Sequence, residues 1–288
     1  MKNENISQKT IKNEIHLSGV GLHSGKRCGV VIEGAKEDSG ICFLDKDKNK
    51  INLSHLSVKD TRLSTVIGNE VFRVGTVEHL LAAVNACGLT NLTIHVTGPE
   101  VPALDGSARD FFYGFLDSGV LRQNKNAKLI KIKKQVLLTI GGKSAFVRPS
   151  EKLVIHNSIN FNHPLIGTQN YTYENSIREF SEICESKTFG FLKDITALKK
   201  VGLALGGNLN NAIVLTDKGV VNRGHLKNNL GFVKHKTLDA LGDFSLFGAQ
   251  VLGEFNLNCS GHLIHSLLIK EVLSNKDNYE IRSSNLSV

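Results

Sequence analysis

Apolar and polar residues alternate over much of the N-terminal third of the chain. Segment 11–32 alternates on both sides of a glycine-rich stretch, Gly19 to Gly25. Because successive side chains of a strand point to opposite faces, this pattern predicts two half-buried strands joined by a turn. Apolar pairs on either side of Gly68 predict a short hairpin, and 91–96 predicts a further strand.

Other stretches repeat their apolar residues at helical spacing. They predict helices at 76–88, 107–116, 177–186 and 191–201, around 235–243, and after residue 260. Thr76, Ser107 and Ser260 are residue types that cap helix N-termini. Gly88 and Gly202 are typical of the residue that follows a helix C-terminus.

Apolar segments in the second half predict another group of strands. They lie at 131–133, 136–138, 153–156, 159–161 and 212–215. Each half therefore mixes strands with helices, which indicates the α+β class. The run from Arg122 to Lys134 has six basic residues and no acidic residue. We interpret this run as a solvated linker with an entering strand, which gives domains at 1–124 and 129–288.

The composition is that of a globular protein. The chain has 288 residues, 41% of them hydrophobic and 22% charged, enough for one large domain or two ordinary ones. Its five cysteines are odd in number and scattered without a CxxC pair, which favours reduced thiols in the cytoplasm. Residues 1–12 lack the apolar core of a secretory signal, and no run of 18 apolar residues predicts a membrane span.

The net charge of +8 favours an anionic partner. Nucleic acid and a diphosphate-bearing nucleotide sugar are both candidates on charge alone. The lysines are not interleaved with aromatic residues and no nucleic-acid motif is present, so we expect no nucleic-acid partner. We expect the protein to act as a monomer.

One stretch, His235 to Asp243, carries the first candidate chemistry. His235 and Asp239 are four residues apart, which on a helix stacks them on one face within reach of one metal ion. Asp243 lies one further turn along, and Lys236 projects to the side of the site. The same spacing is also common on ordinary solvated helices.

A second stretch supplies the complementary residues. Glu78 and His79 fall in the first turn of a predicted helix. A catalytic zinc has three protein ligands and a water, and His79, His235 and Asp239 are ligands of the right types. Glu78 would then suit a base that takes a proton from the water, or else a first-turn acid favoured by the helix dipole. His262 begins a third stretch, where a lone histidine is more often structural than catalytic.

Together these stretches resemble a known family, the zinc-dependent UDP-3-O-acyl-N-acetylglucosamine deacetylases of lipid A biosynthesis in Gram-negative bacteria. The matching segments are 19–25 (GVGLHSG), 76–80 (TVEHL), 102–107 (PALDGS), 187–191 (KTFGF), 205–207 (LGG), 235–243 (HKTLDALGD) and 260–262 (SGH). They occur in the family's order and spacing over about residues 6 to 275, which makes the resemblance specific.

The resemblance implies a fold. It consists of two similar α/β sandwich domains with helices packed between them and the active site at the domain interface. It also implies a small βαβ insert in the second domain, at about 188–222, which forms an apolar passage for an acyl chain. Ala204 stands where the family often has a larger residue, so the resemblance leaves the acyl-chain length open.

The resemblance also implies a reaction, the hydrolysis of the N-acetyl group of UDP-3-O-(3-hydroxyacyl)-N-acetylglucosamine with release of acetate. It assigns zinc to His79, His235 and Asp239, although two histidines and one carboxylate also accept Fe²⁺. Glu78 matches the base and His262 the acid that protonates the leaving amine.

Further positions of the sequence match the family's auxiliary and substrate-binding residues. Asp243 matches the residue that holds the acid, Thr188 an oxyanion donor, Lys236 and Asp194 residues that position the nucleotide sugar, and Phe189 a stacking residue. The implied passage is lined by Phe191, Ile195, Ala204, Gly207, Ala212 and Val214, each of which alone would pass for an ordinary core residue. Another mononuclear zinc amidohydrolase acting on an anionic substrate and a non-catalytic basic binding module remain the alternatives.

Overall fold

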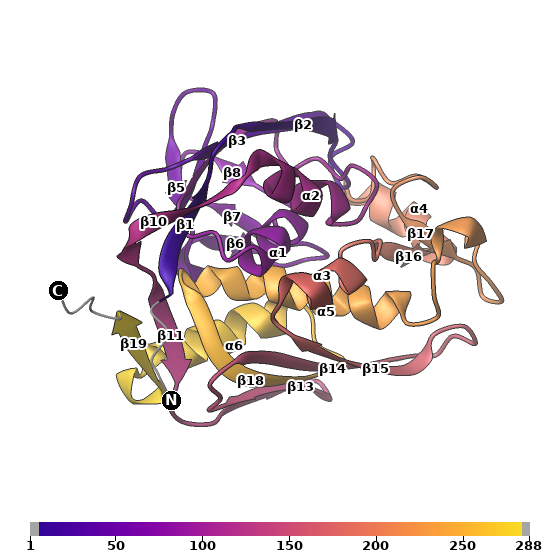
Figure 1. Cartoon of the computed structure of the whole chain (residues 1–288). Coiled ribbons are helices and arrows are strands. Elements are labelled where there is room, and N and C mark those ends of the chain that lie inside the picture. The colour runs from indigo at the N-terminus through magenta and orange to yellow at the C-terminus, as the bar shows by residue number, and fades with distance from the viewer. Residues whose placement is uncertain (1–5, 284–288) are drawn as a thin grey trace.

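The computed structural model describes residues 6–283, which form a mixed α/β structure (Figure 1). The N-terminal half contains a five-stranded sheet. Its order is β2 (Ile15–Val20), β3 (Arg27–Gly34), β9 (Leu92–Thr97), β4 (Ile41–Leu44) and β5 (Lys50–Asn52). All neighbours are antiparallel except β4 and β9. The predicted alternation in 11–32 is confirmed, since β2 and β3 pair across the glycine-rich turn.

Two helices and a small sheet complete this half. The helices are α1 (Glu78–Ala86) and α2 (Arg109–Ser118), and the small sheet holds β6 (Val58–Asp60), β7 (Val66–Gly68) and β8 (Arg73–Val74). The hairpin predicted around Gly68 is the antiparallel β7–β8 pair. The first described strand, β1 (Ser7–Ile11), pairs with β10 (Val120–Asn126).

The C-terminal half is built on a seven-stranded sheet. Its strands are β11 (Lys128–Ile132), β12 (Val136–Ile140), β13 (Lys143–Arg148), β14 (Leu153–Phe161), β15 (Gly167–Glu174), β18 (Gln250–Asn258) and β19 (Tyr279–Ser283). The long strand β18 pairs with β13, β14 and β11. The helices of this half are α3 (Ile177–Ile183), α5 (Gly231–Phe244) and α6 (His262–Ser274).

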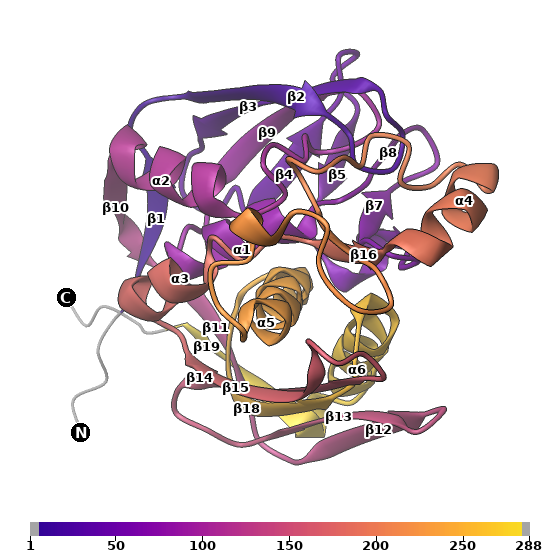
Figure 2. The ribbon, with the colours of Figure 1, turned by 90° about the vertical axis from the view of Figure 1, so that its right-hand side faces the viewer.

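The helices that carry the candidate chemistry lie between the two main sheets. Figures 1 and 2 show α1, α5 and α6 between the N-terminal sheet and the C-terminal sheet. One cluster of buried apolar residues extends across both halves, including Leu80 and Leu81 of α1 and Leu238, Leu241 and Phe244 of α5. The division into domains at 1–124 and 129–288 stays a prediction.

The segment expected to be an insert forms a compact unit at one side of the molecule (Figure 2). It contains β16 (Phe189–Phe191), α4 (Leu192–Lys200) and β17 (Ile213–Leu215). β16 and β17 are parallel, so the unit is a βαβ arrangement. It has its own small cluster of buried residues with Ile159, Phe232 and Val233.

Several local predictions need correction. Thr76 does not cap α1, because its φ of 56° turns the chain away from the helix and Val77 occupies the cap position. Neither Ser107 nor Ser260 is an N-cap, since Ala108 and Gly261 occupy those positions. Gly88, with a φ of 65°, does follow the end of α1.

Two strand predictions also need correction. The segments 153–156 and 159–161 belong to one strand, β14. The basic run from Arg122 contains the expected entering strand, β11, but the part before it is the paired strand β10 and not a solvated linker. No helix among residues 6–283 is long and apolar enough to cross a membrane.

The packing of α1 against α5 depends on Gly242. A Cβ atom placed on Gly242 would overlap the backbone carbonyl oxygen of Glu78. The backbone of the first turn of α1 therefore lies directly on α5, as only glycine allows. This contact sets the distance between His79 and the face of α5 that carries His235 and Asp239.

We expect Gly242→Ala to separate α1 from α5. Overpacking of this kind costs about 1–3 kcal/mol, so the denaturant midpoint should fall. The affinity for a divalent ion should fall with it, since the proposed ligands come from both helices. Gly224→Ala is the control, because no atom lies within 4 Å of its added Cβ. Unchanged stability and metal affinity in Gly242→Ala would contradict the role of this contact.

Candidate active site

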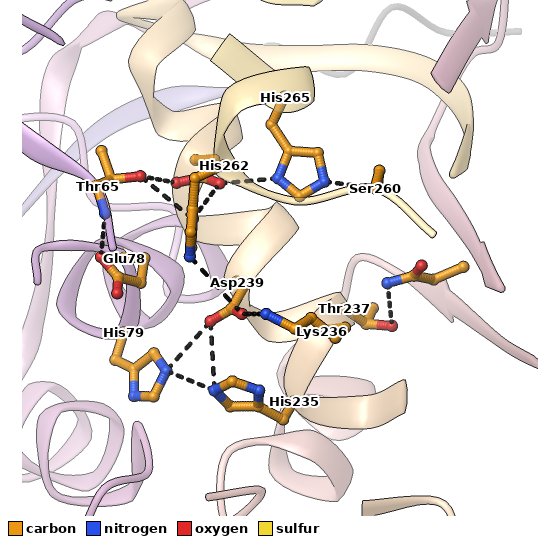
Figure 3. A network of polar contacts seen from close by, with 12 residues as sticks. Thr65, Glu78, His79, His235, Lys236, Thr237, Asp239, Ser260, His262 and His265 are labelled. Atoms are coloured by element: carbon orange, nitrogen blue, oxygen red, sulfur yellow. Dashed lines mark hydrogen bonds and ion pairs between the residues drawn. The ribbon is translucent and has the colours of Figure 1, made fainter. Parts of the chain in front are cut away.

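Three potential metal ligands converge between α1 and α5. His79 lies in the first turn of α1, and His235 and Asp239 lie one turn apart on α5 (Figure 3). The Nε2 atoms of His79 and His235 are 3.2 Å apart. Asp239 Oδ1 lies 3.3 Å from Nε2 of His79 and 3.4 Å from Nε2 of His235. All three residues are buried.

This triangle fits a small divalent ion. Ligands at about 2.0–2.1 Å from a tetrahedral zinc are about 3.3–3.4 Å from one another. Two imidazole nitrogens and a carboxylate oxygen are ligand types that zinc accepts, and one cation would contact all three. Three ligands leave a fourth position for water or substrate, which is the pattern of a catalytic site.

The electrostatics of Asp239 and His235 favour the protonation states that bind metal, whereas those of His79 favour a proton on its ring. Burial alone would raise the pKa of the Asp239 carboxyl, but His235, Lys236 and His79 outweigh it and hold that pKa well below its ordinary value. Burial lowers the pKa of His235 to about 3, so its imidazole is neutral. Burial also acts to lower the pKa of His79, but Asp239 outweighs it and raises that pKa. A cation would therefore displace a proton from this group.

Lys236 and Phe189 flank the triangle. Lys236 Nζ donates to Asp239 Oδ2 at 2.8 Å. This oxygen is not the one that His79 and His235 face. The Phe189 ring meets the His235 ring edge-on with centroids 5.6 Å apart, and Lys236 Nζ lies 6.0 Å from the Phe189 centroid. The predicted placement of Lys236 beside the site agrees with these contacts.

Glu78 lies on the other side of the triangle and is buried. Its Oε2 accepts a hydrogen bond of 3.0 Å from the backbone N–H of Thr65. Burial raises the pKa of its carboxyl, although His262 and His79 act in the opposite direction. A carboxylate with raised proton affinity next to a metal ligand has the properties of a general base.

A second polar group joins α5 to the start of α6. Asp243 Oδ2 accepts hydrogen bonds of 2.8 Å from Nδ1 of both His262 and His265, and Asp243 Oδ1 accepts one of 2.5 Å from the Thr65 hydroxyl. The remaining nitrogens of the two histidines point in different directions (Figure 3). Nε2 of His262 lies 4.0 Å from Asp239 Oδ2, whereas Nε2 of His265 contacts the Ser260 hydroxyl at 2.8 Å. Only His262 therefore faces the metal-ligand triangle.

The interaction with Asp243 favours the protonated form of His262. Burial acts to lower the pKa of this histidine, but the charge and hydrogen bond of Asp243 outweigh burial and raise the pKa to about 9. His262 is thus charged at neutral pH, as a proton donor must be.

The remaining predicted residues lie on or beside the βαβ unit. Thr188 is held through its backbone, since its N–H donates to Gly106 and its carbonyl accepts from Ile213. Asp194 is exposed in the first turn of α4, and Val214 is buried in β17. Phe191, Ile195, Ala204, Gly207 and Ala212 are half-buried. These contacts do not bring the lining residues onto the metal-ligand triangle.

The comparisons with known proteins agree with this geometry. A family model described as UDP-3-O-acyl N-acetylglycosamine deacetylase matches residues 8–274. The chain belongs to this family. It is 44% identical over 271 residues to the UDP-3-O-acyl-N-acetylglucosamine deacetylase of Nautilia profundicola, which covers 93% of this chain and 92% of the relative. The protein of the same name from Syntrophus aciditrophicus is 40% identical over 96% of this chain and 89% of its own length.

Two residues that contact the proposed site, Thr65 and Glu100, were not predicted from the sequence. Thr65 connects Glu78 to Asp243 through its N–H and its hydroxyl, and Glu100 binds the loop after β2. Both roles depend on contacts between residues far apart in the chain. For Glu100, the only sign in the sequence is its place beside Pro99 in a segment that contains glycine and proline.

We expect His79→Ala, His235→Ala and Asp239→Ala each to lose most of the bound divalent ion, because each removes one corner of the triangle. Metal analysis of dialysed protein measures the loss. His95→Ala is the control, since His95 is 40% exposed and contacts Glu33 instead. A His235→Ala protein that keeps one tightly bound ion per chain would contradict the assignment.

Proposed function

We propose that the chain hydrolyses the N-acetyl group of UDP-3-O-(3-hydroxyacyl)-N-acetylglucosamine and releases acetate, in the biosynthesis of lipid A. Curated relatives at 38–44% identity carry the name UDP-3-O-acyl-N-acetylglucosamine deacetylase. The observation that supports the proposal best is the triangle of His79, His235 and Asp239 with Glu78 beside it. Two histidines, one carboxylate, an adjacent base and an open fourth position are the parts of a hydrolytic zinc site.

Glu78 and His262 each carry out one proton transfer in the proposed reaction. Zinc held by His79, His235 and Asp239 would polarise the amide carbonyl and acidify a water molecule. Glu78 takes the proton of the attacking water, whose oxygen bonds to the acetyl carbon. His262 gives its proton to the nitrogen as the C–N bond breaks. The products are acetate and the free amine of the glucosamine.

Asp243 and Thr188 assist these steps in the proposed mechanism. Asp243 orients His262 by accepting its Nδ1–H at 2.8 Å, which directs Nε2 toward the triangle. The Thr188 hydroxyl is proposed to donate to the developing oxyanion, an interaction that stabilises the transition state. This assignment comes from the family resemblance, and the backbone contacts of Thr188 support a fixed position for it.

The substrate is proposed to extend from the triangle toward the βαβ unit. Lys236 and Asp194 would position the nucleotide sugar, and Phe189 would stack on it. The proposed passage for the acyl chain is lined by Phe191, Ile195, Ala204, Gly207, Ala212 and Val214. Three leucines of the unit, Leu192, Leu205 and Leu209, are 50%, 47% and 47% exposed, which supports an apolar surface there.

Further parts of the proposal concern the setting of the enzyme. We propose a monomer in the cytoplasm with domains at 1–124 and 129–288. All five cysteines are unpaired, as expected in a reducing compartment. Zinc is the proposed metal, and the same ligands would also accept Fe²⁺.

The direct test incubates the zinc-loaded chain with UDP-3-O-(3-hydroxyacyl)-N-acetylglucosamine of several acyl-chain lengths and measures acetate. Release of acetate from this substrate, and much less from UDP-N-acetylglucosamine without the acyl chain, is expected. The alternative function, a different zinc amidohydrolase acting on an anionic substrate, would show the opposite preference or activity only on unrelated amides.

We expect Glu78→Gln to retain the metal ion and lose about 10²–10⁴-fold in kcat, the usual contribution of a positioned acid or base. The amide keeps the size of the side chain but cannot accept the water proton. Steady-state kinetics together with metal analysis distinguish this result from loss of the site. Activity near that of the unmodified protein would remove Glu78 from the mechanism.

The two histidines on Asp243 should differ in function. We expect His262→Ala to lose about 10²–10⁴-fold in kcat with metal retained, because its Nε2 faces the triangle. His265→Ala should cost much less, because its Nε2 faces Ser260. An essential His265 together with a dispensable His262 would reverse the assignment.

The Asp243–His262 contact also predicts a shift with pH. Asp243 raises the pKa of His262, so Asp243→Asn should lower it, and activity should be lost at lower pH on the alkaline side. The pH dependence of kcat with saturating metal measures the shift. An alkaline limb that stays in place would show that His262 does not determine it.

A further inference from the structure

Glu100 is a buried carboxylate that holds two separate segments near the active site. It is 5% exposed and forms no ion pair with any of the described residues 6–283. Its Oε1 accepts from the backbone N–H of His23 at 3.0 Å and from the Thr76 hydroxyl at 2.7 Å. Its Oε2 accepts from the backbone N–H of Ser24 at 2.6 Å. Burial alone would raise the pKa of this carboxyl, but these hydrogen bonds outweigh it and lower the pKa.

The first segment is the turn that precedes the catalytic pair. Thr76 has a φ of 56°, which is unusual for any residue with a side chain and a genuine outlier for a β-branched one. Such strain persists only where neighbouring contacts enforce it. The Thr76 hydroxyl is fixed by Glu100, and the neighbouring Gly75 pairs with the backbone on either side of Glu100. Two residues later the chain reaches Glu78 and His79.

The second segment is the loop from Gly21 to Gly25. Its backbone carbonyls accept hydrogen bonds from the βαβ unit, with Leu205 N–H donating to His23 O at 3.1 Å and Gly206 N–H to Leu22 O at 3.0 Å. A Cβ atom on Gly21 would overlap Glu100 Oε2, and one on Gly206 would overlap the Gly21 carbonyl. The Glu100 carboxylate thus contacts the backbone of the loop, and the loop contacts the backbone of the βαβ unit.

We propose that Glu100 is a positioning residue that fixes the strained turn before Glu78 and His79 and, through the Gly21–Gly25 loop, the Ala204–Gly206 segment of the βαβ unit. The proposal rests on the proposed function for the roles of Glu78, His79 and the unit. Under this proposal, the Glu100 side chain has two effects that can be measured separately. One is on the metal site and the other is on the binding of the acylated substrate.

The substitution Glu100→Gln keeps the shape of the side chain and changes its hydrogen bonding. The carboxylate accepts from donors on both of its oxygens, whereas an amide presents an NH₂ group to at least one of these N–H or O–H donors. We expect metal affinity to fall roughly 10- to 100-fold, the usual effect of losing a residue that orients metal ligands. Competition with a chromogenic zinc chelator measures it without substrate. Glu70→Gln is the matched control, since that side chain is 94% exposed.

Substitutions at Thr76 test the path to the metal site. Thr76→Val keeps the shape and removes the hydroxyl, so it should weaken zinc binding, whereas Thr76→Ser keeps the donor and should not. Thr76→Gly adopts a positive φ without strain, so adding Glu100→Gln to it should change zinc affinity less than twofold. An equal effect of Glu100→Gln in both backgrounds would overturn the path through Thr76.

The effect on the βαβ unit has its own readout. Glu100→Gln should raise KM for a long-acyl substrate more than for a short-acyl one, and this difference should persist in the Thr76→Gly background. Equal changes in KM would overturn the link to the unit. If Glu100→Gln does not fold, as urea unfolding would show, Thr76→Val and Thr76→Ser decide the metal-site effect. A chain that binds zinc but releases no acetate would contradict the proposed function, while the zinc-affinity results would still decide the role of Glu100.

Discussion

The contact between α1 and α5 at Gly242 is the constraint on which the site depends. It places two histidine nitrogens and a carboxylate oxygen within 3.2–3.4 Å of one another inside the protein. Burying such polar groups costs free energy unless they interact with one another or with a cation. The apolar packing of both halves around these helices therefore offsets the cost of burying the ligands. A divalent ion would bind the folded state and add to its stability.

The proposed base and acid are connected through Thr65. Its N–H holds Glu78 and its hydroxyl holds Asp243, which in turn holds His262. Thr65 comes from the loop before β7, so three different parts of the chain must be in place together. Hydrogen bonds in a buried site restrict the rotamers of the side chains that make them. The side chains of Glu78 and His262, the proposed base and acid, are therefore held in defined directions.

Sequence reasoning succeeded where the relevant contact is local. The four-residue spacing of His235 and Asp239 predicts that both lie on one face of a helix, because the helical period alone determines which residues share a face. The entry into α1 was predicted wrongly, since Thr76 is a residue type that caps helices but has a φ of 56°, and its hydroxyl donates to Glu100, which is distant in sequence. The sequence placed His262 and His265 near one face of a helix. The contacts of their Nε2 atoms with Asp239 and Ser260, which separate their roles, arise only in the folded chain.

Both proposed proton-transferring residues lie in the first turn of a helix, where the dipole favours negative charge. This has opposite consequences for the two. The dipole favours the ionised form of Glu78, and burial opposes it, with the result that the pKa of its carboxyl is raised. The dipole disfavours the charged form of His262, and Asp243 opposes it, with the result that the pKa of its imidazole is raised. Similar positions on two helices thus suit the proposed base and the proposed acid, because burial counteracts the dipole at Glu78 and Asp243 counteracts it at His262.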